Sequence, residues 1–248
     1  WTAGSHQGRP SWDKPAIVAL SQQCCRAAAS VGSLLAVDGG QPVDDHEDSL
    51  HRARQAYAAR DWRGAADSFD AVALHRLTAD DLAAYADAVW WLGRVEDALR
   101  LDAAACDALV AESRPADAAG VAFRLGVFHV SRGDEPQGMG WFSRSKHLLE
   151  GVRECRVHGL LLLLTGVEAN LVSGQPAAAV DAARQIRELG RRLNEPDLVA
   201  VGLNGEGRAL IKSGAVADGL ALLDETMVTV LEGRLDPFMT GVLYCHTI

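Results

Sequence analysis

The sequence is poor in lysine and has no cluster of basic residues. Only Lys14, Lys146 and Lys212 accompany 21 arginines, and the net charge at pH 7 is -9. Domains that bind nucleic acid usually carry a basic patch that neutralises phosphate charge. We therefore expect this chain to make no direct contact with nucleic acid.

Long apolar runs and paired cysteines are missing too. The strongest apolar run, Leu160–Leu164, is soon followed by Glu168 and Asn170, whereas a membrane-spanning helix needs about 20 apolar residues. The five cysteines are odd in number and irregularly spaced, which fits a reducing compartment better than a disulfide scaffold. We expect a cytoplasmic protein that does not contact the membrane.

Catalytic and cofactor-binding motifs are also absent from the sequence. It contains no GxSxG elbow, no Ser/His/Asp grouping, no paired-carboxylate signature and no phosphate-binding GxxxxGK[ST] loop. Cys155 and His158 have a CxxH spacing, but a stable zinc site needs four ligands and His147 is the nearest further candidate. We favour a loop packed between helices at this point, and we expect no enzyme, no cofactor and no metal site.

Residues 122–151 contain the pattern around which the chain is organised. They predict two helices joined by a turn at Gly133, with Gly126 on the first helix and Gly138 on the second. Glycine has no side chain, so two helices can cross closely at such positions. Phe142 lies one turn beyond Gly138 on the same face. The pattern predicts a closely packed helical hairpin.

The same turn occurs four more times along the chain. Each turn is followed, five residues later, by alanine or glycine, and the spacings between turns are 33, 40, 41 and 40 residues. The turn markers are Arg60, Gly93, Gly133, Gly174 and Gly214, and the small residues are Ala65, Ala98, Gly138, Ala179 and Gly219. Such a recurrence indicates a helical repeat protein.

These hairpins resemble tetratricopeptide (TPR) repeats, although three of the four spacings exceed the 34 residues of a minimal TPR. The resemblance implies an all-α fold: a right-handed superhelical solenoid of about five TPR-like hairpins with a leading N-terminal helix. We assign residues 1–48 to a linker and capping helix, with the helix over residues 15–37, and residues 49–248 to the repeat domain. Residues 238–248 are expected to begin a sixth hairpin, truncated or covered by a partner after Ile248.

Individual helices follow from turn-forming clusters between the hairpins. The first pair is expected over residues 49–60 and 62–76, and Thr78 with Asp81 predicts an N-terminal capping box that opens the second pair. Residues 113–115, 151–159, 194–197 and 235–237 are expected to separate the later pairs, since they are rich in turn-forming residues.

Three segments carry a more specific resemblance: Ala88–Arg94 (AVWWLGR), Glu154–Gly159 (ECRVHG) and Gly241–Cys245 (GVLYC). They are similar to the helical-repeat region of large actinobacterial LuxR-type transcriptional regulators, over residues 46–248. Those proteins join an ATPase or cyclase module to the repeats and often end in a DNA-reading module. Neither module is visible here, so the resemblance implies only the sensing or interaction part.

In TPR solenoids the first helices of successive hairpins line a concave groove. Transferring the groove-facing offsets to this chain gives an apolar floor with tryptophans at one end and polar residues at the other, which suits a peptide with an apolar anchor and an acidic group. The candidate groove residues are Asp87, Trp90, Trp91, Phe123, Val127, Glu168, Asn204, Arg208 and Lys212. The aromatic residues could instead pack between helices, and Arg208 with Lys212 could form a solvated stripe.

Two functions remain open. In the first, the chain is a non-catalytic sensing domain of a transcriptional regulator and binds a peptide or a small-molecule effector in its groove. In the second, it is a scaffold that binds protein partners or forms a homodimer through its C-terminal end.

Overall fold

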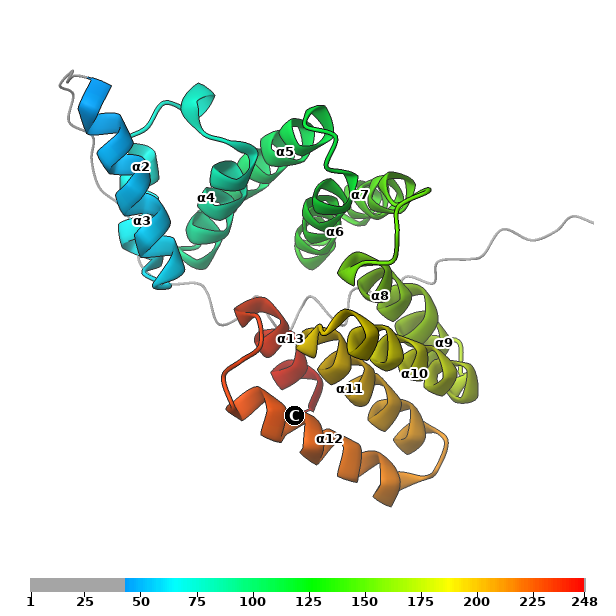
Figure 1. Cartoon of the computed structure of the whole chain (residues 1–248). Helices are drawn as coiled ribbons and strands as arrows, with labels where there is room; N and C mark the ends of the chain where they lie inside the picture. Colours follow the sequence, from blue (N-terminus) through cyan, green and yellow to red (C-terminus); the bar gives the residue numbers. More distant parts are fainter. Residues whose placement is uncertain (1–42, 248) are drawn as a thin grey trace, which may run out of the picture. The chain divides into compact units, whose positions relative to one another are not determined.

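The computed structural model describes residues 43–247, and these residues form helices joined by short turns, without strands (Figure 1). The described residues divide into two compact units, one ending at Val157 and one beginning at His158. Within each unit, helices adjacent in sequence pack against one another. The all-α class and the hairpin pairing expected from the sequence are therefore confirmed.

The first unit contains three successive helix pairs. Its helices are α2 (Val43–Ala58), α3 (Trp62–Asp70), α4 (Ala79–Trp91), α5 (Val95–Ala111), α6 (Pro115–Ser131) and α7 (Glu135–Leu148), with a 3-10 turn at Leu74–Arg76. In the second unit, α8 (Arg156–Leu162), a π-helical segment (Leu163–Glu168) and α9 (Ala169–Val172) follow one another directly. They are succeeded by α10 (Pro176–Leu193), α11 (Pro196–Lys212), α12 (Val216–Leu231) and α13 (Pro237–Thr247). Helix α11 packs against both α10 and α12 (Figure 1).

All five turns expected from the sequence contain a residue in the left-handed backbone region. The φ values are 58° at Arg60, 76° at Gly93, 83° at Gly133, 70° at Gly174 and 97° at Gly214. A left-handed residue ends a helix because the chain can no longer continue the right-handed spiral. Four of the five are glycine, which adopts this conformation without steric cost.

The small residue after each turn lies where the two helices of a hairpin meet. All five positions are buried. A Cβ atom added at Gly138 would lie 2.4 Å from Val130 Cγ2 and 2.9 Å from the carbonyl oxygen of Gly126. The Phe142 ring covers Gly126 so closely that a Cβ there would lie 2.6 Å from it. The close crossing predicted for this hairpin is confirmed.

Several boundaries differ from the expectation. Helix α2 begins at Val43 instead of Ser49, and α3 ends at Asp70, followed by the separate 3-10 turn. Helix α8 begins at Arg156, inside the segment expected to be a connection. The capping box is present, since Asp81 N donates to Thr78 Oγ1 at 3.2 Å and Thr78 N donates to Asp81 Oδ2 at 3.1 Å.

The leading helix expected over residues 15–37 lies outside the described residues, as do the linker and Cys24 and Cys25. Among the helices of residues 43–247, none is long and apolar enough to cross a membrane.

Glycines 138 and 140 of α7 allow a matched test of this packing. Gly138→Ala should lower the free energy of unfolding by about 1–3 kcal/mol, because the new methyl group overlaps Val130 and the Gly126 backbone. The methyl group of Gly140→Ala has no other atom within 4 Å. This substitution should raise the free energy of unfolding by about 0.5–1 kcal/mol, because alanine favours the helix more than glycine does. Urea unfolding measures both; equal effects of the two substitutions would contradict the close crossing.

Candidate ligand-binding site

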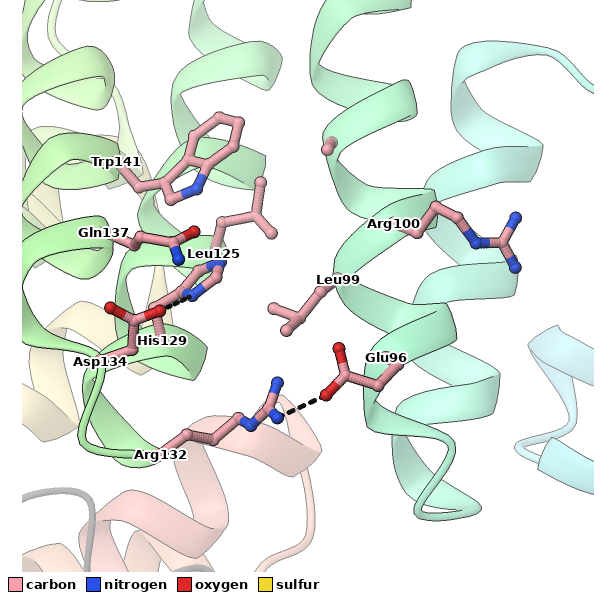
Figure 2. Close-up of a pocket in the computed structure, with 10 residues that line it drawn as sticks. Glu96, Leu99, Arg100, Leu125, His129, Arg132, Asp134, Gln137 and Trp141 are labelled. Carbon is pink, nitrogen blue, oxygen red and sulfur yellow. Dashed lines mark hydrogen bonds and ion pairs between the residues drawn. The ribbon is translucent and has the colours of Figure 1, made fainter.

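A pocket of about 510 Å³ lies between α5 and the α6–α7 hairpin in the first unit (Figure 2). We call it the α5–α7 pocket. Its lining residues are Glu96, Leu99, Arg100 and Ala103 from α5, Leu125 and His129 from α6, Arg132 and Asp134 from the turn, and Gln137 and Trp141 from α7. In Figure 2, Trp141 and Gln137 stand on one side of the pocket and Leu99 and Glu96 on the other.

Both arginines that line the α5–α7 pocket form ion pairs. Arg132 forms an ion pair with Glu96 across the pocket, and His129 Nδ1 lies 3.4 Å from Asp134 Oδ2 (Figure 2). Arg100 extends away from the pocket in Figure 2 and pairs with Asp97 on its own helix at 2.8 Å. An occupant would therefore meet the Arg132–Glu96 ion pair and the polar side chains of His129 and Asp134 at the rim.

The floor of the pocket is apolar. Leu99 and Leu125 are 8% and 1% exposed, and Trp141 provides a flat wall. An aromatic or aliphatic group placed against Leu99 and Trp141 would be removed from water. The ten lining residues include no hydroxyl or thiol that could act as a nucleophile beside His129. The arrangement suits recognition of an apolar anchor with polar edges.

The groove residues predicted in the first unit have different environments. Trp90 stacks on Phe128 with ring centroids 3.5 Å apart, and Phe123 packs against Phe142 at 5.5 Å. Both contacts hold helices together, which was the alternative interpretation of these aromatic residues. Val127 is half-buried.

The two remaining candidates of this unit lie at a surface. Trp91 is 38% exposed and stacks on Trp62 of α3 with ring centroids 6.0 Å apart. Asp87, one turn earlier on α4, accepts a hydrogen bond from the Tyr57 hydroxyl at 3.0 Å. Trp91 is therefore far more exposed than Phe123, which is 6% exposed.

The groove residues predicted in the second unit converge on one another. Arg208 donates to both carboxylate oxygens of Glu168, at 2.6 and 2.9 Å, and Glu168 is 4% exposed. Asn204 donates to Thr247 at 3.2 Å, and Lys212 Nζ donates to the Leu171 carbonyl at 2.6 Å. The first helices of successive hairpins are thus joined by polar contacts, and Arg208 is not part of a freely solvated stripe.

His246 of α13 completes this polar group, with Nδ1 3.4 Å from Arg208 Nη1. Burial lowers the pKa of His246 to about 4, with a further decrease from the Arg208 charge that Glu168 opposes. Glu168 itself ends the π-helical segment, in which a turn contains more residues than in an α-helix. Such segments often occur at functional sites.

The α5–α7 pocket lies outside the predicted groove, whose residues all belong to the first helices of the hairpins. Most of the lining residues lie on the second helices α5 and α7 or in the turn. One signal was present: His129 is a polar aromatic residue near the end of the first helix of the predicted hairpin, and it forms part of the lining. Within residues 43–247, no group of three or more His, Cys, Asp or Glu side chains is placed to hold a metal ion, the Cys155–His158 segment included.

Comparisons with known proteins give no match: no family model, no curated protein and no solved structure is significantly similar to this chain.

The Glu168–Arg208 pair can be tested by a double-mutant cycle. Arg208→Met should lower the free energy of unfolding by about 3–5 kcal/mol, because it leaves a buried carboxylate without its cation. Glu168→Met together with Arg208→Met should cost far less, since an apolar pair of similar volume needs no desolvation of charge. Strictly additive effects in urea unfolding would show that the two groups do not interact.

His246 predicts a pH dependence of stability. Its folded-state pKa, about 4, lies below the ordinary value of 6.5, so between these pH values the unfolded chain binds a proton that the folded chain does not. Lowering the pH from 7 to 5 should therefore reduce the free energy of unfolding by about 2 kcal/mol through this group. His246→Gln should remove that component, so parallel pH profiles for the wild type and the variant would contradict the assignment.

Proposed function

We propose that this chain is the non-catalytic helical-repeat domain of a transcriptional regulator. It binds a peptide segment of a protein partner or a small effector. The observation that carries the proposal is the α5–α7 pocket. Leu99, Leu125 and Trp141 favour binding of an apolar anchor group, and hot spots of peptide recognition usually lie in pockets with such side chains.

Two further observations support the wider assignment. The left-handed turn residue and the small residue after it occur in five hairpins, as in TPR solenoids. The segments Ala88–Arg94, Glu154–Gly159 and Gly241–Cys245 support a repeat region of the LuxR type. We propose on these grounds that the hairpins belong to a right-handed solenoid and serve as the sensing part of such a regulator.

Selection from a random peptide display library, with the full chain as bait, tests the function without requiring an identified partner. We expect enriched peptides to share an apolar anchor residue. Ala103→Phe, which fills the α5–α7 pocket, and Trp141→Ala, which removes its wall, should each weaken binding of a synthetic enriched peptide by about tenfold or more. Isothermal titration calorimetry measures the affinities.

Leu74→Ala is the matched control, because it truncates an exposed apolar residue that does not line the pocket. It should change the affinity by less than about twofold, the effect of a residue outside the interface. Equal binding by Ala103→Phe and the wild type would show that the pocket is not the site. If no motif is enriched, and native mass spectrometry of the purified chain shows no bound small molecule, the proposed function is wrong.

Self-association is a second candidate function, favoured by exposed apolar side chains on α12 and α13. Val216, Leu220, Val228 and Leu231 of α12 are 48–76% exposed, and Tyr244 of α13 is 46% exposed. Clusters of exposed apolar residues commonly mark contact surfaces between proteins. A dimer in light scattering that Leu231→Glu disrupts would favour this function.

A further inference from the structure

Three aromatic side chains from three consecutive helices form a cluster at the surface of the first unit. Tyr57 of α2 meets Trp62 of α3 edge-on, with ring centroids 5.8 Å apart and planes at 64°. Trp62 stacks on Trp91 of α4 at 6.0 Å, with planes at 20°. We call Tyr57, Trp62 and Trp91 the aromatic cluster. Trp62 is half-buried, and Trp91 is the most exposed of the three.

A carboxylate lies against this cluster. Asp87 and Trp91 are four residues apart on α4, so their side chains lie on the same face of that helix, one turn apart. The Tyr57 hydroxyl donates to Asp87 Oδ2 at 3.0 Å. The same tyrosine therefore touches the carboxylate with its hydroxyl and the tryptophan pair with its ring. Asp87 is held in a fixed position beside exposed aromatic faces.

Aromatic faces next to a carboxylate are the chemical complement of a cation. The face of a tryptophan ring attracts positive charge, and a guanidinium group also stacks on it through its flat surface. The carboxylate accepts charge-assisted hydrogen bonds from the edge of the same guanidinium. An apolar occupant would fit less well, because it could make no charge-assisted contact with the Asp87 carboxylate.

We propose that the aromatic cluster and Asp87 form a binding site for an arginine side chain of a partner protein, with the guanidinium stacked on Trp91 and bonded to Asp87. The site adds to the proposed function, since it names a basic residue in the partner. It is separate from the α5–α7 pocket, because none of its four residues lines that pocket. The net charge of -9 favours association with a basic partner.

A single-arginine probe tests the site directly. We would titrate Nα-acetyl-arginine methylamide into the full chain labelled with ¹⁵N-tryptophan and follow the indole N–H signals. The Trp62 and Trp91 signals should shift in a saturable way. Nα-acetyl-citrulline methylamide has the same shape without the charge, and it should bind at least about tenfold more weakly, as expected for losing a charge-assisted contact.

Two variants separate the contributions of ring and carboxylate. Asp87→Asn keeps an oxygen that can accept from Tyr57, so the fold is retained, and it should weaken arginine binding about tenfold. Trp91→Leu should abolish the shift of the Trp62 signal. Trp141→Leu, in the α5–α7 pocket, is the matched control and should leave the Trp62 and Trp91 shifts unchanged.

Equal responses to arginine and citrulline, or no saturable shift of the Trp62 and Trp91 signals, would overturn this inference. Binding that Asp87→Asn leaves unchanged would overturn it as well. The proposed function is tested by separate experiments, namely the display selection and the effect of Ala103→Phe on peptide binding. If arginine does not bind while selected peptides still occupy the pocket, only the present inference is lost.

Discussion

Close approach between the two helices of each hairpin depends on one small residue placed five positions after a turn. At Gly138 and Gly219 the facing backbone is so near that a methyl group would overlap a carbonyl oxygen of the partner helix. Alanine takes the same position in the other three hairpins and is fully buried there. The spacing of the helices, and so the positions of all side chains carried on their outer faces, follows from this constraint.

Between successive hairpins, buried carboxylates paired with arginine provide a second kind of contact. Asp102 of α5 is fully buried and accepts from Arg124 of α6, with the Arg124 Nε bond at 2.9 Å. Glu206 of α11 pairs with Arg184 of α10 at 2.7 Å, and Glu168 pairs with Arg208. A buried charge requires its partner at one defined position, whereas contacts between alanine and leucine side chains tolerate a shift of one helix along the other. We infer that these pairs fix the register of each hairpin on its neighbour.

The all-α class and the helical hairpins could be predicted from the sequence because the determinants of a hairpin are local. A glycine in a turn and a small residue five positions later are visible without knowing distant contacts, and Thr78 with Asp81 marks a helix start in the same way. The candidate site was harder to predict, because the α5–α7 pocket is formed by residues from three helices and a turn. The groove positions taken from TPR solenoids lie on first helices only, so they could not include residues of α5 and α7. The π-helical turn before Ala169 was also missed, since no residue type requires it.

The position of the α5–α7 pocket has a mechanical consequence. One wall belongs to the second helix of one hairpin, and the opposite wall belongs to the next hairpin. A group entering between them would contact both hairpins at once, so its binding would favour one arrangement of the two hairpins over others. Occupancy at one point could then be transmitted as a change of angle between neighbouring hairpins.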